Sequence, residues 1–336
     1  GWDFFREGII LRKFQFWLHE MKGFAYWDLV WKEAPEEANS FAQGLWTNQI
    51  YAHKGRKSGE FSRHANALFH QPFWGKGFPS HGGKFMEVWT IAWQHTGNPE
   101  YLTAISTLLD YFERNISPQS GALRYATKFP NHYSLGHNMG LARSLTGIST
   151  EMPDSIAFRM KVLSDSTDPL YLGFKHDPLA GGKGFIKSAH VHTLEPGEYR
   201  SEHKGGRYTT GMWSSGYGAG NNVKVANSCL SRFGQTGIDA YKDLFLQTAE
   251  AYYASETPPS KRMSPGNYSG IISMMIKAHR VTGEYRFLEK AIEYADRSIE
   301  AVMDSSSPLP KASNENDHYE AITGANGLMS NILNLW

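Results

Sequence analysis

A helical hairpin that turns at Thr-Gly recurs along this chain and constrains its fold more than any other feature. The pattern reads HTGNPEYLTAISTLLDYFERN at 95–115, QTGIDAYKDLFLQTAEAYYAS at 235–255 and VTGEYRFLEKAIEYADRSIEA at 281–301. In each copy a helix-like stretch ends at Thr-Gly and a second begins within a few residues, and glycine just past a helix end is a typical C-cap. The last two glycines are 46 residues apart and the first two 140, close to three such intervals. Repeats of this length predict stacked helical hairpins.

The two helices of each hairpin differ in polarity. Those before Thr-Gly, such as KFMEVWTIAW at 84–93 and IISMMIKA at 271–278, are apolar nearly all round, as expected of buried helices. Their partners are amphipathic with charged faces. Buried inner helices alternating with amphipathic outer ones predict an all-α fold, an (α/α)6–7 toroid of about six or seven hairpins in a single domain over 1–336. An open solenoid is the structural alternative.

The hairpin rhythm fails in the middle of the chain, between residues 151 and 208. Pro, Gly and Asp punctuate SDSTDPLYLGFKHDPLAGGKGFIKSAHVHTLEPGEYRS at 164–201, which predicts an irregular insertion with short strands near 189–194. Long loops in compact domains are usually functional. The stretch 190–222 combines seven glycines with many titratable and aromatic side chains, which favours a site over a solvated surface loop.

Composition excludes several classes of function. The formal net charge is +1, from 34 basic and 33 acidic residues, so neither nucleic acid nor an anionic membrane is an expected partner. A single cysteine, Cys229, excludes an internal disulfide and a multi-cysteine metal site. Aromatic residues make up 14% of the chain, a surplus common both where sugars bind and in large helical cores. No feature specifies an oligomeric state.

A closed ring would bring together the Gly-bearing loops that lead into the inner helices. These loops are SHGG before Lys84, NHYSLGHNMG at 131–140, GYGAGNN before Val223, SPGNYSG before Ile271 and DHYEAITGANGLM at 317–329. The ring then gathers their polar and aromatic side chains at one rim: His81, His132, His137, Asn138, Arg207, Tyr208, Tyr217, Asn221, Asn222, Arg262, Asn267, Tyr268, His318 and Tyr319.

The hairpin period and these loops resemble the α/α-toroid polysaccharide lyases that act on uronic-acid polymers such as alginate or glucuronan. The resemblance covers most of the chain at the level of the fold. It implies an enzyme that cleaves an acidic polysaccharide by β-elimination, without a cofactor. It also implies a secreted or periplasmic protein whose signal peptide has been removed. Related six-hairpin folds carry glycoside hydrolases and sugar epimerases, so the fold alone does not choose.

The resemblance implies a tyrosine or histidine that removes the C5 proton and a donor that neutralises the C5 carboxylate. Negative charge builds in the intermediate, so donors must already face it. A tyrosine base needs nearby positive charge, because its ordinary pKa is near 10. The expected catalytic residues are Asn138, His192, His203, Tyr208, Tyr268 and Arg262. Tyr268 is the preferred base, because it lies at the mouth of an inner helix. The expected substrate-binding residues are Trp74, His81, His137, Arg200, Arg207, Trp213, Tyr217 and Asn222.

The histidine pair in HVH at 190–192 raises the question of a metal. A strand would put both imidazoles on one face, and His203, Glu195, Glu198 or Glu202 would complete a divalent-cation site. The pair lacks the HExxH spacing of helical zinc sites. A solvated or substrate-binding pair is therefore favoured, and no metal is expected.

Two other functions remain open. A six-hairpin hydrolase of unsaturated uronyl oligosaccharides needs two carboxylates, and its candidates are Asp154, Asp177, Glu198, Glu202, Asp317 and Glu320, which no spacing pairs. A non-catalytic carbohydrate-binding helical-repeat protein would need an exposed concave aromatic surface and no aligned Tyr, His and Arg.

Overall fold

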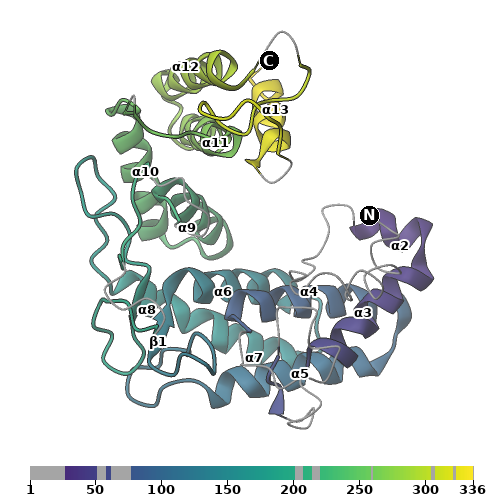
Figure 1. Cartoon of the computed structure of the whole chain (residues 1–336). Helices are drawn as coiled ribbons and strands as arrows, with labels where there is room; N and C mark the ends of the chain where they lie inside the picture. Colours follow the sequence, from purple (N-terminus) through teal and green to yellow (C-terminus); the bar gives the residue numbers. More distant parts are fainter. Residues whose placement is uncertain are drawn as a thin grey trace. The chain divides into compact units, whose positions relative to one another are not determined.

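The computed structural model describes residues 27–50, 58–61, 77–200, 207–213, 220–258, 260–303, 307–320 and 323–335. This part of the chain is mainly helical (Figure 1), as predicted. It falls into two compact units, 1–174 with 187–208, and 175–186 with 209–336. The single domain over 1–336 stays a prediction. Among the described helices, none has both the length and the apolarity that a membrane span requires.

Unit 1 is built on two inner helices that lie side by side, α4 and α6, with α5 and α7 packed against them (Figure 1). Trp89 of α4 and Leu145 of α6 are fully buried in its core. In chain order its helices are α2 (Trp27–Glu33), α3 (Pro35–Gln49), α4 (Pro79–Thr96), α5 (Pro99–Arg114), α6 (Leu135–Ser149), α7 (Asp154–Asp165) and α8 (Thr167–Leu172).

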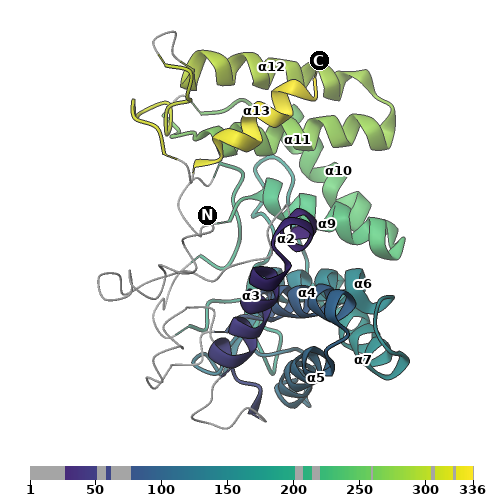
Figure 2. The same ribbon diagram turned by 90° about the vertical axis from the view of Figure 1, so that its right-hand side faces the viewer.

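Unit 2 is organised around α11, which packs against α9, α12 and α13 (Figure 2). Ile272 and Met275 of α11 are fully buried, as are Tyr252 of α10 and Tyr294 of α12. Its helices are α9 (Asn222–Thr236), α10 (Asp239–Tyr253), α11 (Pro265–Thr282), α12 (Tyr285–Val302) and α13 (Ala325–Leu333).

Each repeated Thr-Gly is a helix C-cap, as the sequence predicts. Gly97, Gly237 and Gly283 end α4, α9 and α11 with φ of 67°, 72° and 76°. In each case the glycine N–H donates to a carbonyl four residues earlier at 2.7 Å. A positive φ strains residues that carry a Cβ, so glycine is the natural residue here.

The threonine before each glycine joins the two helices of a hairpin. The hydroxyls of Thr96, Thr236 and Thr282 donate to the carbonyl four residues earlier at 2.7–2.9 Å. Each hydroxyl oxygen also accepts from the backbone N–H two residues later, at 3.1–3.3 Å. One side chain thus satisfies a group at the end of one helix and a group at the start of the next.

The insertion begins later than predicted. Residues 154–165 form α7, which packs against α6, and α8 continues to Leu172. Ile156, Met160 and Leu163 of α7 are buried at helical spacing, so this stretch is the outer helix of a hairpin. The predicted strand near 189–194 is shorter: β2 (Ser188–His190) pairs antiparallel with β1 (His132–Ser134), and a turn follows.

Two glycines of α9 allow the C-cap to be tested. An added Cβ meets no atom within 4 Å at either Gly234 or Gly237, but only Gly237 has a positive φ. We expect Gly237→Ala to lower the free energy of unfolding by about 1 kcal/mol, because of left-handed strain. Gly234→Ala should raise it by up to about 1 kcal/mol, because alanine favours helix. Urea denaturation measures the free energy of unfolding of each variant. If the two substitutions change it in the same direction, the assignment of Gly237 as a left-handed C-cap is contradicted.

Candidate active site

Five ring side chains of unit 1 pack together at the start of the inner helices. Tyr125 stacks on Phe78 with ring centroids 4.4 Å apart. The His137 ring lies 5.1 Å from Tyr125 and 4.9 Å from Phe78. His132 is 4.9 Å from Tyr125, and His81 is 5.8 Å from His137. These five residues are called the Tyr125 cluster below.

Small residues bring α4 and α6 close enough to form this cluster. A Cβ on Gly140 of α6 would lie 2.7 Å from the Ser80 Cβ of α4, and a Cβ on Gly83 would lie 2.9 Å from the Ser144 Cβ. At this separation Ser80 Oγ and His137 Nδ1 are 2.6 Å apart. The glycines therefore bring a hydroxyl of one inner helix into contact with an imidazole of the other.

The loop that carries Tyr125 is held by backbone and amide hydrogen bonds. The Tyr125 N–H donates to the His132 carbonyl at 2.8 Å. Asn138 of α6 donates through Nδ2 to the carbonyls of Leu123, at 3.3 Å, and Ser134, at 2.9 Å. Asn138 is buried. Its predicted role as carboxylate donor has little geometric support, because these hydrogen bonds occupy its amide nitrogen.

A buried carboxylate and an arginine adjoin the Tyr125 cluster. Glu198, whose side chain is 3% exposed, accepts from Arg200 Nε at 2.8 Å and from Nη2 at 2.9 Å. Burial alone would raise the pKa of Glu198. The hydrogen bonds from the side chain and backbone of Arg200, together with the charge of Arg200, outweigh burial, so this pKa lies below its ordinary value. Arg200 also donates a hydrogen bond to the Tyr125 hydroxyl oxygen.

His132 is a buried, neutral imidazole at neutral pH. Its pKa is lowered to about 4, mainly by burial; Glu198 opposes this shift, and the charges of Arg200 and Lys187 add to it. Its Nδ1 lies 3.5 Å from Glu198 Oε1. This contact is not an ion pair at neutral pH, because the neutral imidazole carries no positive charge.

Further positive charge lies at the start of α6. The Lys187 carbonyl accepts from the N–H of Leu135, the first residue of α6, at 3.1 Å, and the Lys187 N–H donates to the Tyr208 carbonyl at 2.9 Å. Burial lowers the pKa of Lys187, as do Arg200 and Arg207, while Glu198 raises it. Three cations therefore influence a region that also holds Glu198, an arrangement that suits an anionic ligand.

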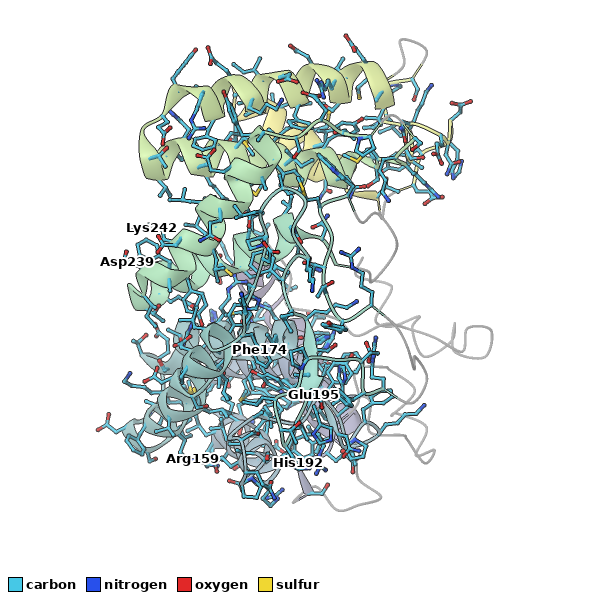
Figure 3. All side chains as sticks on the ribbon, turned by 90° about the vertical axis from the view of Figure 1, so that its left-hand side faces the viewer. Arg159, Phe174, His192, Glu195, Asp239 and Lys242 are labelled. Carbon is cyan, nitrogen blue, oxygen red and sulfur yellow. The ribbon has the colours of Figure 1, made fainter. Side chains whose placement is uncertain are left out.

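Unit 1 contains several predicted site residues beside the cluster. His81, His137 and Arg200 belong to or touch it, whereas Arg207 and Tyr208 are exposed. His192 lies after β2 (Figure 3), with Nδ1 3.0 Å from Ser117 Oγ and 3.1 Å from Gln119 Oε1. These contacts hold a loop and do not direct His192 toward Tyr125.

The histidine pair of the HVH motif shows no metal geometry. The His190 and His192 rings are 5.6 Å apart and T-shaped, and His190 Nδ1 accepts from the His192 N–H at 3.3 Å. Glu198 is bonded to Arg200. Across the residues that the structure describes, no three His, Cys, Asp or Glu side chains are grouped to bind a metal ion.

Unit 2 holds the preferred tyrosine of the sequence analysis. Tyr268 is buried in α11, and burial raises its pKa, Arg297 opposing and Tyr294 adding to the rise. Arg262 is exposed. The surroundings of Tyr268 therefore shift its pKa away from the value that a base requires. Asn222 accepts from Thr210 Oγ1 at 2.5 Å, and Trp213 packs against Tyr252 with centroids 5.0 Å apart.

Three predicted residues, Trp74, His203 and Tyr217, lie outside the described residues. Conversely, Tyr125 and Lys187 are not among the site residues predicted from the sequence. A signal for Tyr125 exists in RYATKFPNHYSLGH at 124–137. This loop leads into an inner helix and is dense in aromatic and histidine residues.

Comparison with solved structures identifies the fold. A cellobiose 2-epimerase from Bacillus thermoamylovorans B4167 gives a TM-score of 0.59 at 12% identity, over 92% of this chain and 84% of that one. A D-mannose isomerase gives 0.50 at 13% identity, over 80% and 70%. An α-1,6-mannanase, GH76A of Salegentibacter sp. HEL1_6, in complex with α-1,6-mannotriose, gives 0.50 at 11%, over 89% and 98%. The chain therefore has the predicted α/α-toroid fold. No protein-family model matches the sequence, and the search of curated proteins finds no relative.

Acid should destabilise the protein through His132. Its pKa is about 4 when folded and 6.5 as the ordinary value, so the unfolded chain binds more protons between these values. The free energy of unfolding should therefore be highest above pH 6.5 and fall toward pH 4, by up to about 3 kcal/mol. Urea denaturation at several pH values should show that the free energy of unfolding depends less steeply on pH in His132→Gln than in wild type. His318→Gln, which changes an exposed imidazole, should keep the wild-type slope. An unchanged slope in His132→Gln would contradict the assignment.

Proposed function

We propose that this chain is a carbohydrate-processing enzyme that cleaves a uronate-bearing saccharide by proton abstraction and β-elimination. The observation that carries the proposal is the hydrogen bond from Arg200 to the Tyr125 hydroxyl. The His137 ring packs against Tyr125, and the charge of Lys187 acts on His132, which also contacts Tyr125. A guanidinium at a phenol favours the phenolate, which is the form that accepts a proton from carbon. Tyr125 thus replaces Tyr268 and Tyr208 as the preferred base.

Each step of the elimination has a candidate group. Tyr125 takes the C5 proton and the electron pair of that bond forms the C4–C5 double bond. The C4–O4 bond breaks, its electron pair stays on O4, and the Tyr125 hydroxyl passes the proton on to O4. Charge accumulates on the C5 carboxylate during proton removal, where Lys187, Arg200 and His137 supply donors and positive charge. These cations support the choice of an acidic sugar as the substrate.

The solved structures support the coarser part of the proposal. They are a cellobiose 2-epimerase, a D-mannose isomerase and an α-1,6-mannanase. This fold hosts different sugar chemistries, so the choice among reactions rests on the site.

Hydrolysis fits the Tyr125 cluster less well. Both oxygens of Glu198 accept hydrogen bonds from Arg200, and its pKa lies below the ordinary value. A general acid needs a raised pKa instead. Epimerisation is the second candidate, because Tyr125 and His137 place two proton-transfer groups with rings 5.1 Å apart. It shares the proton abstraction but leaves the chain uncut.

Absorbance near 235 nm, measured during incubation with alginate, glucuronan, polygalacturonate, heparan and chondroitin types, tests the proposal. Elimination conjugates a C4–C5 double bond with the carboxylate, and this product absorbs there. We expect a rise with at least one uronan, and Tyr125→Phe should lower kcat by about 100-fold or more.

Other tyrosines provide the controls. Tyr133→Phe removes a buried hydroxyl that makes no hydrogen bond among the described residues and should retain the rise. If Tyr268→Phe or Tyr208→Phe abolishes the rise while Tyr125→Phe does not, the base is misassigned. New reducing ends without absorbance would replace the lyase by a hydrolase.

A further inference from the structure

Ser80 and His137 form a contact between two inner helices that the elimination scheme does not use. Ser80 is the second residue of α4, after Pro79, and His137 is the third residue of α6. Their Oγ and Nδ1 atoms are 2.6 Å apart, a short hydrogen bond. The ring of His137 also packs against Phe78 and Tyr125, so its plane is set from two directions.

The position of Ser80 indicates which partner donates. A serine inside a helix often donates to the carbonyl four residues earlier, but Ser80 is in the first turn, where no such helical carbonyl exists. The nearby Phe78 carbonyl already accepts from the N–H groups of His81, at 2.9 Å, and Gly82, at 3.2 Å. His137 Nδ1 is then the acceptor within hydrogen-bond distance of the Ser80 hydroxyl.

We propose that Ser80 is a positioning residue that holds neutral His137 in its Nε2–H form, so that His137 donates a hydrogen bond to an anionic oxygen of the substrate. Because neutral imidazole carries one proton, an Nδ1 that accepts leaves the proton on Nε2. The substrate role rests on the proposed function, whereas the proton position is a property of the protein alone.

The packing of α4 against α6 makes this arrangement rigid. Gly140 leaves no room for a Cβ beside Ser80, so the backbone of Ser80 is held close to α6. A donor fixed before the substrate binds needs no reorganisation as charge develops on the carboxylate. His137 would therefore stabilise the same charge that Lys187 and Arg200 attract.

The proton position is measured by long-range 1H–15N NMR of protein labelled at histidine, with the His137 signals assigned from His137→Gln. The pH is kept above the titration of the ring. Wild type should show His137 as one Nε2–H tautomer. Ser80→Ala should give a mixture of tautomers. Ser144→Ala removes a hydroxyl elsewhere on the α4–α6 interface and should leave the tautomer unchanged.

Gly140→Ala is a second variant, for use if Ser80→Ala fails to fold. It keeps the Ser80 hydroxyl but places a Cβ 2.7 Å from the Ser80 Cβ. It should therefore also give a mixture of His137 tautomers. An Nδ1–H tautomer in wild type, or an unchanged tautomer in the folded variants, would overturn the inference.

Kinetics on the uronan that wild type cleaves tests the substrate role. Ser80→Ala should lower kcat/KM about three- to tenfold, the effect of one lost hydrogen bond, and Ser144→Ala should not. If Ser80→Ala gives a mixture of His137 tautomers but leaves kcat/KM unchanged, the substrate role of His137 is overturned. An Nε2–H tautomer in a protein that cleaves no uronan would uphold the positioning by Ser80 and refute the proposed function.

Discussion

The candidate site depends on how closely α4 approaches α6. A side chain at Gly83 would collide with Ser144, and one at Gly140 would collide with Ser80. The N-terminal halves of α4 and α6 therefore pack with their backbones close together. That approach brings Ser80 to His137 and places His137 against Phe78 and Tyr125. Asn138 then ties the preceding loop to α6. Packing thus sets the geometry of the titratable groups, as rigid elements do in preorganised sites.

The electrostatics follow from one buried carboxylate among several cations. Glu198 balances Arg200 directly. Lys187 is a further cation, and its pKa is lowered by burial and by the charges of Arg200 and Arg207. Removing Glu198 would leave a half-buried cluster of like charges. Its presence lets Arg200 remain beside Tyr125 and still leaves the region suited to an anion. Burial is the main reason that His132 stays neutral, and the charges of Arg200 and Lys187 add to it.

Elements governed by local rules could be predicted from the sequence, and the site could be predicted only in part. The Thr-Gly turns rest on a left-handed glycine and a threonine hydroxyl, both of which are local chemistry. Helix α7 is not predicted from the sequence, because proline and aspartate around it are typical of a loop. Asn138 is predicted to bind the substrate carboxylate, and its amide nitrogen donates to Ser134, four residues earlier, and to Leu123, 15 residues earlier; the contact with Leu123 depends on how the preceding loop packs. Tyr125 is not predicted, because its partner, Arg200, lies 75 residues away in the sequence.

The central claim is that the chemistry begins with removal of a proton from carbon by Tyr125. Proton NMR of a cleaved uronan, with the reaction run in D2O, tests it most directly. The account predicts an olefinic H4 signal from a new unsaturated uronate end, formed by wild type and not by Tyr125→Phe. Saturated ends would show hydrolysis, and deuterium on an uncut chain would show epimerisation. Either outcome, or an olefinic signal that persists at full rate in Tyr125→Phe, would contradict the account.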